Sequence, residues 1–227
     1  MNFAASLVAA LALMQTAPAA EADAPATTHF QQCVDSIDAD PGQAYEEGMA
    51  WSTMTGEVGG YRCAAMALIA QNRFEEGARR LEALANSTPT EHVSLRAELM
   101  YQAGNAWLLG RDAGHARSAF TLAIAALNSG RITEGLPDVY IDRARAYALE
   151  EDWRHSEEDL SNALDLRTND ALALRLRAYA RMQQSAFDLA EADALAAVAL
   201  EPTNVDALLM LGHAREAKRT GAPITPP

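Results

Sequence analysis

The sequence predicts an all-α fold made of stacked helix–turn–helix repeats, and three observations lead to this prediction. Ala and Leu dominate the 227 residues, β-branched residues are sparse, and Gly and Pro stand mainly at intervals, as in helices joined by short turns. Small residues recur in one phase of a 34-residue frame, and large apolar residues recur in another. A generic helical bundle has no reason to keep small residues in phase from unit to unit, so a repeat is the better interpretation.

The small residues mark the places where the two helices of a unit are expected to cross closely. Position 8 of the frame, on the first helix, is small in every unit: Ala65, Gly104, Ala144, Ala178 and Gly212. Position 20, on the second helix, is also small: Gly77, Ala116, Ser156 and Ala190. Position 4 supplies large side chains: Tyr61, Met100, Tyr140, Leu174 and Leu208. Three residues depart from the pattern at positions where a large apolar side chain is expected: Ala113, Arg181 and Ala194.

The period divides most of the chain into units. The four full units are predicted at residues 58–91, 97–130, 137–170 and 171–204. A final helix at 205–219 ends in Arg, Glu and Lys side chains, so we expect it to cap the exposed end of the stack. Residues 220–227 contain Gly221 and three prolines and are predicted to form a flexible tail.

The chain before the first unit has two parts. Residues 1–22 are predicted to be a cleaved signal peptide, because an uncharged apolar run over 4–14 is followed by two small-x-small patterns. The run is too short for a permanent membrane helix, so we expect a periplasmic or secreted protein with no stable membrane insertion. Residues 23–57 are predicted to form an N-terminal helical cap, a degenerate repeat whose second helix begins at Asp40-Pro41.

The two cysteines have two interpretations. Cys33 lies in the predicted cap and Cys63 in the first helix of the first unit. In an oxidising compartment they are expected to form a disulfide that ties the cap to the repeats. The alternative is two separate reduced thiols, buried as small apolar side chains.

This arrangement resembles the tetratricopeptide repeat (TPR) family over about residues 58–219. The resemblance implies a right-handed α-solenoid, in which the first helix of each unit lines a concave groove suited to an extended peptide or a partner helix. On this frame the predicted partner-binding groove residues are Arg62, Met66, Tyr101, Asn105, Arg145, Arg175, Tyr179, Met182 and His213.

The groove arginines also leave two alternatives open. They could grip the carboxylates of an acidic segment of the partner, or they could pair with groove acids such as Glu98 and Asp138. The family has a carboxylate clamp for chaperone C-termini, and the resemblance places only Asn105 at a matching clamp position. Tyr101 replaces the basic residue, Asp142 stands at the second Asn position, and Leu172 and Leu176 replace Lys and Arg. The sequence therefore predicts that this particular specificity is absent.

Composition and motifs narrow the function further. The net charge of −13 argues against nucleic acid as a partner. The sequence contains no phosphate-binding loop, zinc-protease motif, nucleophile elbow or Cys-x-x-Cys pair, so we expect no cofactor, no metal and no enzymatic activity. The leading hypothesis is an adaptor that binds a protein or peptide in the groove. The alternative is a self-associating homodimer of the cell envelope, and the sequence does not settle the oligomeric state.

Overall fold

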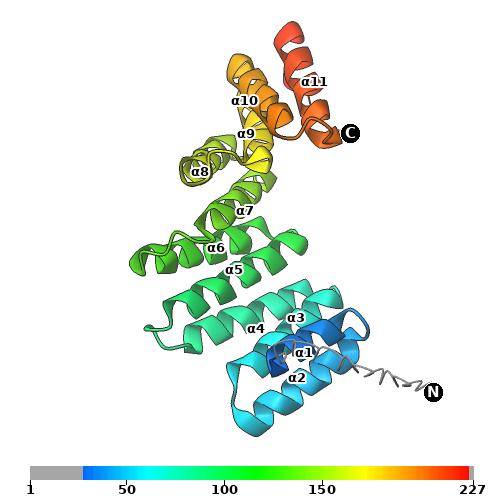
Figure 1. Cartoon of the computed structure of the whole chain (residues 1–227), viewed down its shortest axis with the longest axis vertical. Coiled ribbons are helices and arrows are strands. Elements are labelled where there is room, and N and C mark those ends of the chain that lie inside the picture. The colour runs from blue at the N-terminus through cyan, green and yellow to red at the C-terminus, as the bar shows by residue number, and fades with distance from the viewer. Residues whose placement is uncertain (1–27, 225–227) are drawn as a thin grey trace, which may run out of the picture.

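The computed structural model describes residues 28–224, which form helices without any strand (Figure 1). In chain order these helices are α1 (His29–Ile37), α2 (Pro41–Thr55), α3 (Val58–Ala70), α4 (Phe74–Ser87), α5 (Val93–Leu109), α6 (Ala113–Ser129), α7 (Leu136–Leu149), α8 (Trp153–Leu166), α9 (Ala171–Gln183), α10 (Phe187–Leu200) and α11 (Val205–Thr220). Each helix packs against its neighbours in the chain or the next but one, which gives an elongated solenoid. The predicted all-α repeat fold is therefore confirmed. The predicted signal peptide, residues 1–22, lies outside the described residues.

The helix pairs α3–α4, α5–α6, α7–α8 and α9–α10 overlap the four sequence units, one pair to each unit. The first helices of the second and third units begin earlier than the frame, at Val93 and Leu136. No described helix has the length and the hydrophobicity needed to cross a membrane.

The close crossing inside a unit is clearest between α5 and α6. A Cβ atom added to Gly104 would lie only 2.5 Å from Cε1 of Phe120, which is fully buried. In the first unit a Cβ on Gly77 would lie 2.9 Å from the backbone oxygen of Ala65. A larger residue at either glycine would have to push the helices apart, which explains why the frame keeps these positions small.

Two buried ion pairs repeat with the period of the frame. Arg143 donates two hydrogen bonds to the carboxylate of Asp159, both at 2.7 Å, and Arg177 donates two to Asp193, at 2.8 and 2.9 Å. Each arginine also donates to a hydroxyl of the preceding unit, namely that of Thr121 or Ser161. Burial opposes the charge of Arg143, but its hydrogen bonds with Asp159 raise the pKa of the guanidinium. These two arginines therefore tie the third unit to the second and the fourth unit to the third.

Arg181, which stands where the frame expects a large apolar residue, belongs to the same network of ion pairs. Its side chain donates to Glu157 of the preceding unit and to Asp193 of its own unit, both at 2.8 Å. An arginine at this position thus replaces the apolar contact made elsewhere with an ion pair between units.

A second repeated contact caps α6 and α8. The carboxylate of Asp112 accepts a hydrogen bond from the backbone N–H of His115, whose ring stacks on Trp107 at 4.5 Å between ring centres. The equivalent residues of the next unit are Asp152, His155 and Tyr147. The bonds from His115 backbone and ring hold the pKa of Asp112 below its usual range, and those from His155 do the same for Asp152.

These caps predict a specific pH dependence. Asp112→Asn with Asp152→Asn keeps side chains that can cap a helix but removes both charges. Because the carboxyl pKa is lower in the folded state than in the unfolded state, the charge contribution is complete above the unfolded value of 3.8 and is lost as the pH falls below it. The difference in urea midpoint between parent and variant should therefore be present at pH 7 and shrink as the pH falls below 3.8. A difference that stays the same at pH 7 and pH 3 would contradict this explanation.

The N-terminal cap packs against the first unit through direct backbone contact. Asp40 caps α2 by accepting a hydrogen bond from the N–H of Gln43 at 2.9 Å, and Pro41 occupies the first turn. Where α2 crosses α3, a Cβ on Gly60 would lie 2.7 Å from the backbone oxygen of Gly48. The two helices approach this closely only because both residues are glycine.

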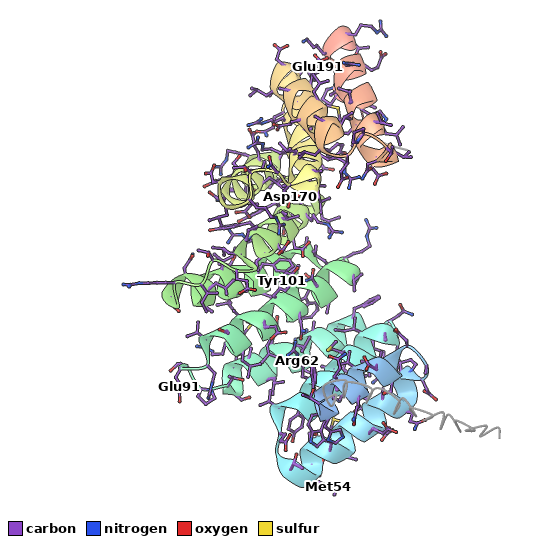
Figure 2. All side chains as sticks on the ribbon, in the orientation of Figure 1. Met54, Arg62, Glu91, Tyr101, Asp170 and Glu191 are labelled. Carbon is purple, nitrogen blue, oxygen red and sulfur yellow. A yellow bond between two sulfur atoms is a disulfide. The ribbon has the colours of Figure 1, made fainter. Side chains whose placement is uncertain are left out.

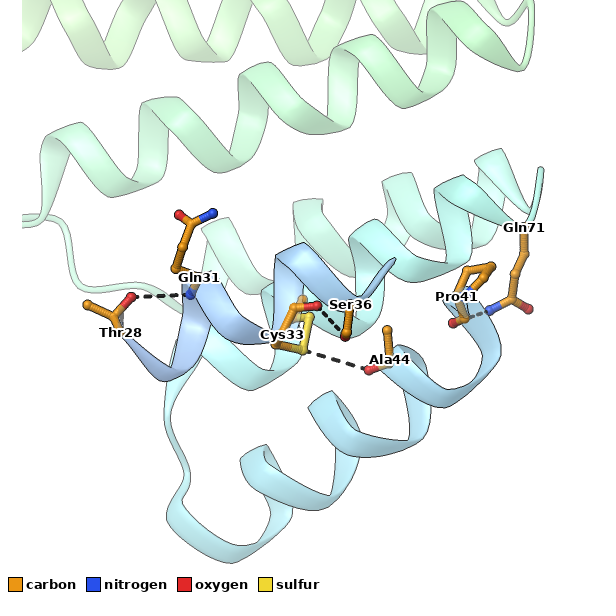
Figure 3. Close-up of a disulfide and its surroundings, with 8 residues drawn as sticks. Thr28, Gln31, Cys33, Ser36, Pro41, Ala44 and Gln71 are labelled. Atoms are coloured by element: carbon orange, nitrogen blue, oxygen red, sulfur yellow. Dashed lines mark hydrogen bonds between the residues drawn. A yellow bond between two sulfur atoms is a disulfide. The ribbon is translucent and has the colours of Figure 1, made fainter. Parts of the chain in front are cut away.

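The predicted disulfide is present (Figure 3). Cys33 on α1 is bonded to Cys63 on α3, their Cα atoms are 6.2 Å apart, and both residues are buried. Close by, the side-chain amide of Gln71 at the end of α3 donates to the backbone oxygen of Pro41 at 2.9 Å. Both contacts tie the cap to the first unit, and the alternative of two free thiols does not hold.

Removing the disulfide should destabilise the protein. The bond joins residues 30 apart in the chain, and for a loop of this length the loss of chain entropy in the unfolded state is worth about 3–4 kcal/mol. We expect the Cys33→Ser/Cys63→Ser variant to lose that much free energy of unfolding relative to the oxidised parent in urea titrations. In reducing agent the two proteins should converge. A loss below about 1 kcal/mol would mean that packing alone holds α1 in place.

The residues that follow α11 contact the last helices of the stack. Gly221 ends α11 with a φ of 70°, a conformation that glycine adopts readily. Ile224 then packs against the cluster formed by α9, α10 and α11, and its backbone oxygen accepts a hydrogen bond from Gln183 at 3.3 Å. The flexibility of residues 220–227 stays a prediction, and residues 225–227 lie outside the described residues.

Candidate functional site

Two adjoining hollows lie along the first helices of the units. The larger, of about 600 Å³, lies among α5, α7, α8 and α9, and its lining includes Leu108, Leu149, Trp153, Leu176 and Tyr179. The smaller, of about 430 Å³, lies among α1, α3 and α5, and its lining includes Val34, Ile37, Met66 and Ile69. Asn105 and Leu109 line both hollows, so the two form one surface, which we call the groove. The groove is largely apolar, as binding sites for peptides and small molecules commonly are.

A hydrogen-bonded group stands beside the larger hollow. The hydroxyl of Tyr101 donates to one carboxylate oxygen of Asp142 at 2.9 Å, and Arg145 donates to the other at 3.0 Å. Burial, together with the negative charge of Asp142, raises the pKa of Tyr101 to about 12, so its hydroxyl stays protonated at neutral pH. Asp142 is buried, so its negative charge opposes the binding of a second carboxylate at this point.

The groove arginines divide between the two alternatives. Arg62 pairs with Glu98 of the next unit and lies over the ring of Phe30, and its side chain is only 13% exposed (Figure 2). Arg175 pairs in the same register with Asp206, at 2.5 Å. Both side chains therefore connect neighbouring units rather than stand open to a ligand.

Arg145 is different, because its side chain is 56% exposed and lines the larger hollow. It donates only one of its bonds to Asp142. Its outer donors remain free to reach a ligand in the hollow.

Four other predicted groove residues have varied positions. Tyr179 lines the larger hollow, where its ring meets Trp153 edge-on at 5.4 Å between ring centres. Met66 lines the smaller hollow, and His213 is half-buried on α11 outside both. Met182 is fully buried, so the prediction that it lines the groove is wrong. The reason is that α11 packs directly on α9 and Met182 joins the core between them.

Sequence reasoning missed several residues that line the larger hollow. Leu109 and Leu149 occupy position 13 of their units and remain exposed, although both are large and apolar. Arg111, two residues after Leu109, lies in the turn between α5 and α6 with a φ of 59°, and it also lines the larger hollow. Among the described residues, no carboxylate pairs with Arg111. The sequence signal that could have identified the two leucines is that both stand at position 13 of successive units.

Comparison with solved structures identifies proteins of similar fold. No protein-family model matches the sequence, and no curated protein matches it. Among solved structures, the MamA RS-1 ArsTM double mutant matches 77% of this chain and 91% of its own, with 15% identity and a TM-score of 0.64. YrrB, described as a TPR protein with an unusual peptide-binding site, matches 77% of this chain and 85% of its own, with 18% identity and a TM-score of 0.59.

A third structure is the first TPR of Spaghetti (RPAP3) bound to the HSP90 peptide SRMEEVD. It matches 56% of this chain and 95% of its own, with 23% identity and a TM-score of 0.51. At these identities the likeness concerns the fold, and it agrees with the repeat of helix pairs described above. The chain therefore has the fold of a TPR domain.

Proposed function

We propose that this protein is an exported adaptor that holds an extended peptide segment of a partner protein in the groove. The observation that carries the proposal is the larger hollow. Its apolar side chains come from four helices of three successive units and remain at least partly open to solvent, whereas the core side chains are buried. An apolar side chain of a peptide placed there would gain burial without any rearrangement of the helices.

The charges around the hollow favour an acidic peptide. Arg111 and Arg145 stand at the hollow in a protein whose net charge is −13. A guanidinium binds carboxylates through paired hydrogen bonds, and a nearby apolar surface strengthens such bonds by excluding water. We infer that the ligand places an apolar side chain in the hollow and acidic side chains beside it.

The solved structures are consistent with this function. YrrB is described as having a peptide-binding site, and the TPR of Spaghetti is bound to the acidic peptide SRMEEVD. The present chain lacks the clamp residues for a carboxylate terminus, so we propose an internal acidic segment as its ligand.

Export is part of the proposal. The uncharged apolar run at residues 4–14 fits a signal peptide, and the disulfide between Cys33 and Cys63 fits an oxidising compartment. The periplasm or the extracellular space meets both conditions.

The test is a binding measurement on the chain without residues 1–22. The probes are labelled peptides with one Phe or Leu among glutamates, together with the same peptides carrying lysines instead. We expect the acidic peptides to bind and Leu149→Glu to weaken them about tenfold or more, because the new carboxylate would stand in the apolar hollow. Leu189→Glu is the matched control, since Leu189 is 51% exposed and Leu149 47%, but it lies on α10 outside both hollows. Equal losses in the two variants, or none in Leu149→Glu, would contradict the proposal.

A further inference from the structure

The last helix, α11, presents an open apolar face at the end of the solenoid. Val205 and Leu208 occupy positions 1 and 4 of the frame and are 67% and 46% exposed. At position 4 of two earlier units, Met100 and Leu174 are only 4% and 8% exposed, whereas Tyr61 in the first unit is 41% exposed; at position 1, Ala97 and Ala171 are only 3% and 9% exposed. In those units the second helix packs against the first, whereas α11 is the last described helix. The face stays exposed even though Ile224 packs near the other end of α11.

Gly212 marks the crossing point of this face. It occupies position 8, where Gly104 lies against Phe120 in the second unit. A Cβ added to Gly212, in contrast, would meet no atom within 4 Å. The residue type expected for a close helix crossing is therefore present on α11, and the described chain supplies no helix to cross it.

A charged residue completes the pattern. Arg181 and Arg215 are 34 residues apart, and so are their partners in the preceding second helices, Glu157 and Glu191. Nε of Arg181 donates to Glu157 at 2.8 Å, and Nε of Arg215 donates to Glu191 at 3.0 Å. Glu191 lies on α10 beside α11 (Figure 2). Arg181 also donates to Asp193 on the second helix of its own unit, at 2.8 Å. Among the described residues, no second carboxylate bonds to Arg215.

We propose that the face formed by Val205, Leu208, Gly212 and Arg215, the end face, docks an amphipathic helix of a partner protein. The docked helix carries a small residue over Gly212 and an acidic residue three positions later against Arg215. The second helices of the last two units have this pattern: Ser156 with Asp159, and Ala190 with Asp193. These helices cover the equivalent faces within the chain, so the end face would accept a helix of the same kind from outside.

A second copy of the chain fits the end face less well. In α11 the residue three positions after Gly212 is Arg215, so two copies pairing through α11 would offer a base where an acid is needed. The end face is also separate from the groove, so the proposal does not depend on what the groove binds.

The probe for the test is the sequence of α10, Phe187–Leu200, as a labelled synthetic peptide. A helix of 14 residues is marginal in water, so a hydrocarbon staple replaces Ala192 and Ala196, which are exposed in α10 and lie one turn apart. Fluorescence anisotropy with the full chain should show saturable binding. Asp193→Asn in the peptide and Arg215→Gln in the protein should each weaken binding about tenfold, and their combination should add little, because both remove the same ion pair.

Gly212→Leu separates docking from folding. A Cβ atom at this position has open space around it and leucine favours helix more than glycine does, so we expect the variant to fold at least as stably as the parent. It should nevertheless abolish peptide binding by filling the crossing point. Lys218→Gln is the matched control, since it removes a charge from the same helix off the proposed contact, and it should bind normally.

Three results would overturn the proposal. The first is no saturable binding of the stapled peptide to the parent, and the second is unchanged affinity in Gly212→Leu. The third is a dimer of the parent in light scattering that Gly212→Leu dissociates, because a second copy would then occupy the end face.

Discussion

Replacing Asp193 with Ala should lower the free energy of unfolding by about 3–5 kcal/mol. Asp193 accepts hydrogen bonds from Arg177 and Arg181, and all three side chains are less than a fifth exposed. Without the carboxylate, Arg177 would keep its charge in a largely buried site with only the hydroxyl of Ser161 as a partner. The cost comes from the buried charge left unpaired, rather than from a large net gain when the pair forms.

Two further variants separate these contributions. Asp188→Ala is the control, because Asp188 is also on α10 and also ion-paired, yet its side chain is 87% exposed, and we expect a loss of less than about 1 kcal/mol. Arg177→Met with Asp193→Leu removes both partners of the bidentate pair, and it should recover a large part of the loss. Urea titrations followed by circular dichroism measure all three. A loss below about 1 kcal/mol in Asp193→Ala would show that the arginine finds another partner.

Phe120→Ala should have an effect of similar size, a loss of about 3–5 kcal/mol. Phe120 is fully buried and lies against Gly104, with the ring of Tyr101 at 5.9 Å between centres. Because Gly104 has no side chain to move into the vacated space, truncation should leave a cavity between α5 and α6. Leu122→Ala, on the same helix but at a residue 53% exposed, should cost much less.

The cavity explanation has its own test. In the Phe120→Ala protein, adding Gly104→Ala should recover part of the lost stability, because the new methyl group enters the space that the ring occupied. In the parent, Gly104→Ala should destabilise, since its Cβ would lie 2.5 Å from the Phe120 ring. If Gly104→Ala lowers the urea midpoint equally in both proteins, the helix crossing is not limited by this contact.

The frame of the fold could be predicted because it depends on residue size at fixed spacing. Gly104 and Gly77 indicated close crossings, and those crossings exist. The ion pairs were harder to predict, although Arg143 and Arg177 were visible at the same spacing. Their pairing with Asp159 and Asp193 depends on which turns of the two helices face each other, and residue size does not report this.

The candidate site was predicted only in part, for a similar reason. The frame predicts which side of each first helix faces the groove, and three residues predicted on that side line the larger hollow: Asn105, Arg145 and Tyr179. Trp153 and Arg111 belong to the start of a second helix and to a turn, so reasoning from first helices alone could not include them. The prediction that Met182 lines the groove is wrong because α11 packs on α9 and covers this side chain, an effect of tertiary structure at the end of the stack.

The central claim, that the groove holds a peptide, is tested most directly by site-specific photo-cross-linking. A photoreactive phenylalanine analogue replaces Leu149 in one protein and Leu189 in another, two leucines of similar exposure, of which only Leu149 lines the larger hollow. Each protein is irradiated with the tightest-binding acidic peptide, and mass spectrometry identifies the attached product. Attachment at position 149 with little at position 189 is the predicted result. Equal attachment at both positions, or attachment at position 189 alone, would contradict the assignment of the groove.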